Sequence, residues 1–236
     1  MKSPVRSVRS CVRGVSFKST IKTGFKTKAI TLFLLINLMV WPTSGSAKQL
    51  GDLASSHPGL RVPGAFDGFE TAVRGILGQQ VSVKAATTLM GRFVDAFGEP
   101  LETPFAELTR VSPTAQSIAK LSPADIASLG IVLNRAKSII ALAQEITRGD
   151  LSLESAPEIE KTLARLKELP GIGEWTAQYL AMRALGWPDA FPHGDLGIRK
   201  ALKQDNPKQL LQMSEAWRPW RSYAAMHIWK KLEEQS

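Results

Sequence analysis

The sequence predicts an all-α protein of roughly eight to ten helices with short connections. Three observations support this fold class. Apolar residues recur at spacings of three and four along residues 52–236, good helix-start residues precede several of these segments, and no segment there alternates convincingly between polar and apolar residues. The composition, with 44% hydrophobic and 22% charged residues, is that of a globular protein.

The first 47 residues differ from the rest of the chain. Residues 1–28 are basic and free of acids, and residues 29–47 carry no charge. This arrangement, with small residues at its end, resembles an export signal, although its basic part is long for one and its apolar run is short for a membrane span. A mis-assigned start that translates sequence foreign to the folded protein explains it as well, and we favour that reading. The folded domain is therefore expected at residues 48–236.

The net charge of +9 is not by itself evidence for nucleic-acid binding. Residues 1–51 hold nine Lys or Arg and no acid, so the 30 basic residues of the chain leave 21 against 21 acids in residues 52–236. An argument for DNA binding must therefore rest on a local site. The one cysteine, Cys11, excludes an internal disulfide and a cysteine-built zinc site.

Helical periodicity continues through the middle of the chain. The spacing of apolar residues predicts two helices with a break near residues 78–82, and the second helix ends at Gly98. These apolar residues are Val73, Ile76, Leu77, Val81, Val83 and Leu89. Good helix starts are Ser112–Pro113 and Ser122–Pro123. A further helix is predicted by Ile139, Ile140, Leu142, Ala143 and Ile146. The next helix should begin near Pro157, with Ile159, Leu163 and Leu166 on its inner face.

Residues 169–173, LPGIG, join two helical patterns. Gly171 and Gly173 permit a positive φ and let a phosphate approach the backbone where the next helix begins. Leu169 and Ile172 would hold the turn in the core. A helix–helix turn without any ligand has the same pattern, and for a bare GxG it is the more common case. The complete string LPGIGEWTA favours phosphate binding.

Asp195 lies between a loop containing Pro and Gly and a helical segment. An Asp at such a place most often serves only as an N-cap. The same position favours the ionised form, which suits a catalytic carboxylate. His193, two residues earlier, could shuttle a proton and is the weaker candidate. His57 and His227 form no recognisable metal pair with it.

Aromatic residues gather in two places. Trp175 and Tyr179 are four residues apart, so both project from one face of the helix that follows the hairpin. In most helical proteins such a pair is core. A second group, most of it expected in the core, consists of Trp217, Trp220, Tyr223 and Trp229. An aromatic pocket would favour a flipped-out, positively charged purine by stacking and cation–π attraction.

Five strings in order, PGLRVPGAFDGFE, ILGQQVSV, LPGIGEWTAQYLAMRALG, FPHGDLGIRK and WRPWRSYAAMHIW, cover about residues 57–230. Together they resemble the 3-methyladenine DNA glycosylase II family of the helix-hairpin-helix DNA glycosylase superfamily. The resemblance implies two helical subdomains with the active site in the cleft between them, and a hairpin at about residues 163–185. It implies a monofunctional glycosylase that flips alkylated purines, of the 3-methyladenine and 7-methylguanine type, out of double-stranded DNA and hydrolyses the N-glycosidic bond in base-excision repair.

The resemblance also implies roles for single residues. Asp195 is the essential catalytic residue, at the floor of a base pocket lined by Trp175, Tyr179 and Trp229. Candidates for the wedge that fills the gap left by the extruded nucleotide are Gln79 and Gln80. The residues of the hairpin that contact DNA are Gly171 and Gly173. A monovalent cation, Na⁺ or K⁺, is held by the backbone carbonyls of Lys167, Leu169 and Gly171, and no cofactor is required.

Three features depart from the family pattern. Trp175 occupies the position of the nucleophilic Lys of lyase-competent members, so a Schiff base and strand cleavage are not expected. Leu196 stands where an aromatic neighbour of the acid can occur, which leaves the selectivity of the pocket open. A small α/β domain often precedes the helical part, whereas residues 1–47 stand there in this chain, and this favours the mis-assigned start.

Two other functions remain open. The chain could be a non-catalytic helix-hairpin-helix DNA-binding protein that uses its aromatics only for the core, or an exported helical protein of unrelated function. For the glycosylase we expect a cytoplasmic monomer that binds alkylated DNA and needs no stable protein partner. Asp195 would act either as an electrostatic stabiliser or as a general base, and the sequence does not separate these roles.

Overall fold

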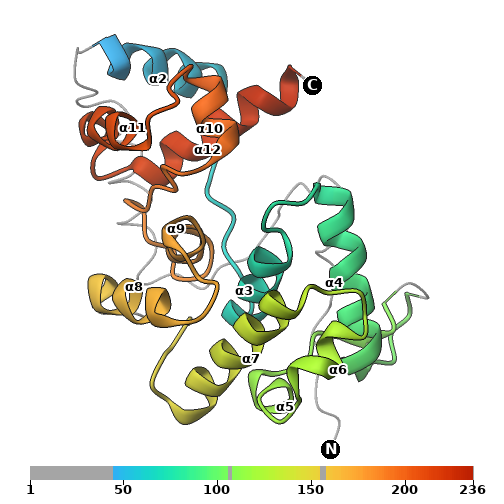
Figure 1. Cartoon of the computed structure of the whole chain (residues 1–236). Coiled ribbons are helices and arrows are strands. Elements are labelled where there is room, and N and C mark those ends of the chain that lie inside the picture. The colour runs from blue at the N-terminus through green and yellow to red at the C-terminus, as the bar shows by residue number, and fades with distance from the viewer. Residues whose placement is uncertain (1–44, 106–107, 155–157, 236) are drawn as a thin grey trace, which may run out of the picture. The chain divides into compact units, whose positions relative to one another are not determined.

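The computed structural model describes residues 45–105, 108–154 and 158–235, with the backbone alone for residues 45–50 (Figure 1). The all-α prediction is confirmed, because eleven α-helices and one 3₁₀ helix fill most of this part of the chain. The helices are α2 (Gly45–Ser56), α3 (Gly68–Leu77), α4 (Val83–Phe97), α5 (Ala115–Ile118), α6 (Pro123–Ala127), α7 (Leu133–Arg148), α8 (Ile159–Glu168), α9 (Glu174–Arg183), α10 (Leu196–Ala201), α11 (Pro207–Ser214), η1 (Glu215–Trp217) and α12 (Arg221–Glu234).

A short antiparallel pair, β1 (Glu99–Pro100) and β2 (Arg110–Val111), is the one departure from helix and loop among the described residues. Strands of two residues are too short to show alternation in a sequence, so the pattern could not predict them. The guanidinium of Arg110 also donates to the carbonyl of Gly98 at 2.7 Å, which ties this pair to the end of α4.

Local capping explains where several helices begin. The predicted break between α3 and α4 is confirmed, since the Ser82 hydroxyl accepts the N–H of Ala85 and starts α4, which ends before Gly98. Ser122 starts α6 as predicted, in a reciprocal capping box with Asp125. That carboxylate accepts hydrogen bonds from Ser122, which lower its pKa.

Two details of the sequence prediction are wrong. The helix expected to start at Ser112–Pro113 begins at Ala115, because the Thr114 hydroxyl accepts the N–H of Ser117 and caps the helix two residues later. Val83, one of the apolar residues that predict α4, is 84% exposed at the first position of that helix.

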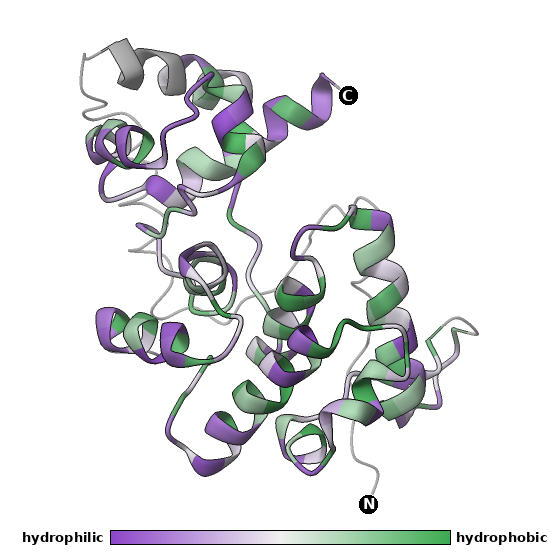
Figure 2. Cartoon of the chain, viewed as in Figure 1, coloured by the Kyte–Doolittle hydropathy of each residue, from purple (hydrophilic) through white to green (hydrophobic). Residues whose placement is uncertain are grey.

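Helix contacts connect α3 to α4, α7 and α9, and they connect α5 and α6 to α7 and α8 to α9. Nearer the C-terminus, α10 packs on α12, and α12 packs on α2. The expected division into two helical subdomains with a cleft between them stays a prediction. Figure 2 shows hydrophobic and hydrophilic residues on different faces of α4, α7 and α8. The largest fully buried side chains are Trp217, Phe93, Phe191, Ile76, Leu77, Ile118, Ile126, Ile139, Leu142, Leu166 and Leu180.

The expected leader lies almost entirely outside the described residues, which begin at Gly45. Pro157, the expected start of α8, also lies outside them, whereas Leu163 and Leu166 are buried on the inner face of that helix as predicted. Among the helices that the structure describes, none has the length and apolar character needed to cross a membrane.

Candidate active site

The hairpin consists of α8, the turn of residues 169–173 and α9. Leu169 and Ile172 are buried and hold the turn in the core, as the sequence predicts. Gly171 has φ +73°, and a Cβ at this position would overlap the Ser138 hydroxyl of α7. Glycine is therefore required at Gly171 both by backbone conformation and by space.

Gly173 does not adopt the positive φ that a glycine permits. Its φ is −89° and its ψ is −178°, since it is the N-cap residue of α9, a position that takes extended backbone. A Cβ at Gly173 would meet no atom within 4 Å, and no side chain caps the helix. The N-terminus of α9 therefore presents its first N–H groups beside open space, as an anion-binding helix end does.

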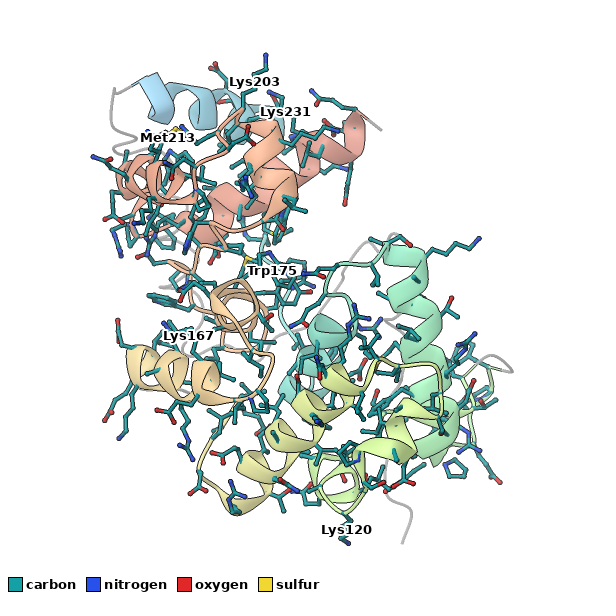
Figure 3. The ribbon with its side chains drawn as sticks, in the orientation of Figure 1. Lys120, Lys167, Trp175, Lys203, Met213 and Lys231 are labelled. Carbon is teal, nitrogen blue, oxygen red and sulfur yellow. The ribbon has the colours of Figure 1, made fainter. Side chains whose placement is uncertain are left out.

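Charged side chains stand beside this helix end. Figure 3 shows Lys167 on α8 and Trp175 on α9. Glu174 accepts hydrogen bonds from Lys167 Nζ and Gln178 Nε2, each at 3.0 Å. Burial alone would raise the pKa of Glu174, but these two hydrogen bonds, together with nearby positive charge, outweigh it and bring that pKa below its usual value. His193, the sequence candidate for a proton shuttle, is close enough to contribute to this lowering of the pKa.

Asp195 caps a helix, as the sequence predicts, and its carboxylate has further partners; its catalytic role stays a prediction. It is the N-cap of α10, with Oδ1 accepting the N–H of Ile198 at 2.9 Å. Its carboxylate also accepts two indole N–H groups, from Trp229 Nε1 on Oδ1 at 3.1 Å and from Trp175 Nε1 on Oδ2 at 2.9 Å. Three N–H donors from α9, α10 and α12 therefore fix the orientation of one carboxylate.

The aromatic pair on α9 extends from this carboxylate to α3. Trp175 and Tyr179 are stacked, with ring centroids 5.3 Å apart and an interplanar angle of 13°. The Tyr179 ring lies against Gly75, where a Cβ would be 3.2 Å from its Cδ1 atom, and the guanidinium of Arg183 is 5.8 Å from its centroid. The structure thus brings the three predicted pocket residues, Trp175, Tyr179 and Trp229, to one carboxylate and its neighbouring ring.

The remaining C-terminal aromatics pack elsewhere. Trp217 is buried against the edge of Phe191, with ring centroids 5.5 Å apart, as expected of a core residue. Trp220 and Tyr223 form an edge-to-face pair, with ring centroids 5.7 Å apart. From this group, Trp229 donates to Asp195.

The two wedge candidates, Gln79 and Gln80, differ in their surroundings. The Gln79 amide points inward and donates to the carbonyl of Gly171 and to the hydroxyl of Thr176, at 3.0 and 2.9 Å. Gln80 is exposed and has φ 54°. Gln80 is therefore the more exposed of the two candidates in the loop between α3 and α4.

The carbonyls proposed to hold a monovalent cation already have partners in part. Leu169 O accepts the N–H of Ile172 at 3.2 Å, and Gly171 O accepts the Gln79 amide. A carbonyl oxygen has two lone pairs, so each keeps one for an ion, and neutral carbonyls suit Na⁺ or K⁺. The monovalent cation stays a prediction. In the described part of the chain no cluster of three or more His, Cys, Asp or Glu side chains could hold a metal.

An ion network built on one buried pair, which sequence reasoning missed, holds the loop that leads to Asp195. Asp189 and Arg221 are each 5% exposed, and the guanidinium donates to both carboxylate oxygens at 2.8 and 2.9 Å. Glu215 accepts from Arg218 and Arg221 at 2.7 and 3.1 Å, and the Arg218 contact lowers its pKa. The sequence does hold an indication of this network. Asp189 and Arg221 stand inside apolar, aromatic segments, where an unpaired charge would be costly.

The fold and site together define a protein of the helix-hairpin-helix class. The chain belongs to the HhH-GPD superfamily of base excision DNA repair proteins, whose family description matches residues 73–217. It is 41% identical over 180 residues to DNA-3-methyladenine glycosylase 2 of Escherichia coli, covering 76% of this chain and 63% of that protein. It is 39% identical over 193 residues to the "Probable bifunctional transcriptional activator/DNA repair enzyme AlkA" of Mycobacterium tuberculosis, covering 80% of this chain and 38% of that protein.

Solved structures agree on the fold. A 3-methyladenine DNA glycosylase from Archaeoglobus fulgidus has a TM-score of 0.65 at 21% identity, over 88% of this chain and 76% of that one. An 8-oxoguanine glycosylase/lyase from Clostridium acetobutylicum has a TM-score of 0.69 at 17% identity, over 80% of this chain and 67% of that one. The chain spans 38% and 63% of the length of the two curated relatives above.

Proposed function

We propose that this protein is a DNA glycosylase that flips alkylated purines, such as 3-methyladenine and 7-methylguanine, out of double-stranded DNA and hydrolyses the N-glycosidic bond. The observation that carries the proposal is the Asp195 carboxylate, oriented by Trp175 and Trp229 beside a stacked aromatic pair. The names of the curated relatives, which include 3-methyladenine glycosylases, support the same substrate class.

The chemistry of the substrate explains why one carboxylate suffices. A purine alkylated on a ring nitrogen is cationic and leaves as a neutral molecule, so its departure needs no general acid. The enzyme must stabilise the positive charge that develops on the sugar. A carboxylate about 4 Å from that charge supplies on the order of 4 kcal/mol at an effective dielectric constant near 20, or about three orders of magnitude in rate.

The hydrogen bonds indicate which carboxylate oxygen faces the reaction. Oδ1 of Asp195 accepts from Ile198 N and Trp229 Nε1, whereas Oδ2 accepts from Trp175 Nε1. A carboxylate has about two acceptor sites on each oxygen, so Oδ2 keeps capacity for the sugar or for a water. Asp195 Oδ2 is therefore the atom assigned to electrostatic stabilisation of the sugar or to activation of the attacking water.

The hairpin supplies the grip on the DNA backbone. The N-terminus of α9 has no side-chain cap, and the space beside Gly173 is open. A phosphate there would accept the free N–H groups and gain from the helix dipole. A Na⁺ or K⁺ ion on the carbonyls of Lys167, Leu169 and Gly171 would add positive charge beside the same phosphate.

The proposed enzyme is monofunctional. A lyase needs an amine to attack the sugar, and Trp175, which stands at the position of that amine, has only an indole N–H, which donates to Asp195. The product should then be an abasic site in an intact strand. We also expect a monomer that acts on DNA in the cytoplasm.

The test is release of methylated purines from alkylated duplex DNA by the purified protein, with the strand examined on a denaturing gel. Release of free base with an uncut strand is expected. A protein that binds the duplex and frees no base would support the rival function, a non-catalytic DNA-binding protein. Cutting of the strand without heat or alkali would contradict the monofunctional assignment.

A further inference from the structure

Gln79 forms hydrogen bonds with three other parts of the fold. Its side-chain amide donates to Gly171 O in the hairpin turn at 3.0 Å and to Thr176 Oγ1 on α9 at 2.9 Å. Its backbone carbonyl accepts a hydrogen bond from the Arg135 guanidinium on α7. One residue of the loop between α3 and α4 is thus fixed to α7, to the hairpin turn and to α9.

The hairpin turn is equally constrained on its other side. Gly171 lies so close to Ser138 that a Cβ would overlap the hydroxyl, and Leu169 and Ile172 are buried. Neither the turn nor the residue that contacts it is free to shift alone. A displacement of the hairpin turn would therefore either move Gln79 or break its hydrogen bond to Gly171.

The neighbouring residue Gln80 depends on this attachment. Gln80 has φ 54° and an exposed side chain, and the left-handed region is unfavourable for a residue with a Cβ. Such a conformation persists where the surrounding chain holds it. Gln79 holds it on one side, and Ser82, which caps α4 by accepting the N–H of Ala85 at 3.2 Å, holds it on the other.

We infer that Gln79 is a positioning residue that couples the hairpin to the wedge loop, so that Gln80 enters the base stack in register with the phosphate held at the hairpin. This inference rests on the proposed function, because it requires DNA at the hairpin and an extruded base. In this arrangement Gln79 does not insert into DNA, since its amide is already bonded to Gly171 and Thr176. Binding of the DNA phosphate at the hairpin and insertion of Gln80 into the gap in the base stack then occur together.

The experiment compares Gln79→Met, which keeps the length of the side chain and removes its donors, with Gln80→Ala and with the double variant. Base extrusion is followed by the fluorescence of 2-aminopurine beside a methylated purine in a duplex, and base release by single-turnover kinetics. Each single variant should lower both signals about tenfold on a fully paired substrate. The double variant should be little worse than either one, because an uncoupled wedge and a missing wedge have the same consequence.

A substrate in which the lesion is already unpaired provides the control. Extrusion costs less there, so Gln79→Met and Gln80→Ala should both regain most of the wild-type rate. If the effects of the two substitutions multiply in the double variant, Gln79 acts independently of Gln80 and the coupling is refuted. A Gln79→Met protein with wild-type extrusion refutes it as well.

Thr176→Val serves as a second variant should Gln79→Met fold poorly. It removes one acceptor of the Gln79 amide and leaves the bond to Gly171, so a smaller loss of extrusion, of the same sign, is expected. A Thr176→Val loss that persists on the unpaired substrate contradicts the coupling. Absence of base release by the wild-type protein would refute the proposed function instead, so the two failures are distinguishable.

Discussion

Replacing Trp175 by Phe removes the indole N–H that donates to Asp195 Oδ2 at 2.9 Å and keeps a ring able to stack on Tyr179. A hydrogen bond to a charged group contributes about 1.5–3 kcal/mol, and each 1.4 kcal/mol corresponds to about tenfold in rate. If the bond holds Oδ2 toward the sugar, the single-turnover rate of base release should fall by about 10-fold to 150-fold. The assay is release of a methylated purine from a duplex at saturating enzyme.

The chain provides two comparisons for this substitution. Trp229→Phe should cost less rate than Trp175→Phe, because Oδ1 of Asp195 keeps the N–H of Ile198. Trp217→Phe makes the same chemical change in the core, where Nε1 is buried without a hydrogen-bond partner. It should lower the melting temperature and leave the rate per folded molecule unchanged. A wild-type rate for Trp175→Phe, or an equal loss for Trp217→Phe, would refute the reasoning.

Three other substitutions test separate parts of the account. Gly171→Ala should destabilise the hairpin, because Gly171 has a φ of +73°. Gly173→Ala should keep the wild-type melting temperature and weaken duplex binding. Equal melting curves for the two variants would contradict this. Glu174→Gln removes a negative charge beside the proposed phosphate site. It should raise the affinity for undamaged duplex severalfold at low salt, as measured by fluorescence anisotropy. An unchanged affinity would show that no phosphate binds there. Burial and the nearby His57 lower the pKa of His227 below 6.5. The contribution of His227 to stability is therefore present above that pH and is lost as the pH falls. His227→Gln should flatten the decline of the melting temperature between about pH 7.5 and 5.5, and an unchanged decline would count against this role.

Local features of the site could be predicted from sequence because their causes lie within a few residues. The break between α3 and α4, the turn around Gly171 and the helix that starts after Asp195 each follow from a cap or a glycine next to an apolar pattern. The error at Ser112 is of the same local kind. Two hydroxyl residues compete for one helix start, and Thr114 makes the hydrogen bond.

Contacts between distant segments could not be predicted in this way. Gln79 and Gly171 are 92 residues apart, and Trp229 is 34 residues from Asp195. Periodicity indicates which face of a helix is buried, but not which helix it meets. The resemblance to a family identifies the pocket residues by their positions in its motifs. It does not reveal that both indoles donate to the carboxylate or that Gln79 points inward.

The central claim is that Asp195 performs the chemistry of base release. Asn is also a good N-cap, so Asp195→Asn should keep α10 and the fold while it removes the charge. The most direct measurement is base release from alkylated duplex DNA by the wild-type and Asp195→Asn proteins, with duplex affinity measured in parallel. We expect release by the wild-type protein alone and the same affinity for both. Equal release by Asp195→Asn would contradict the account.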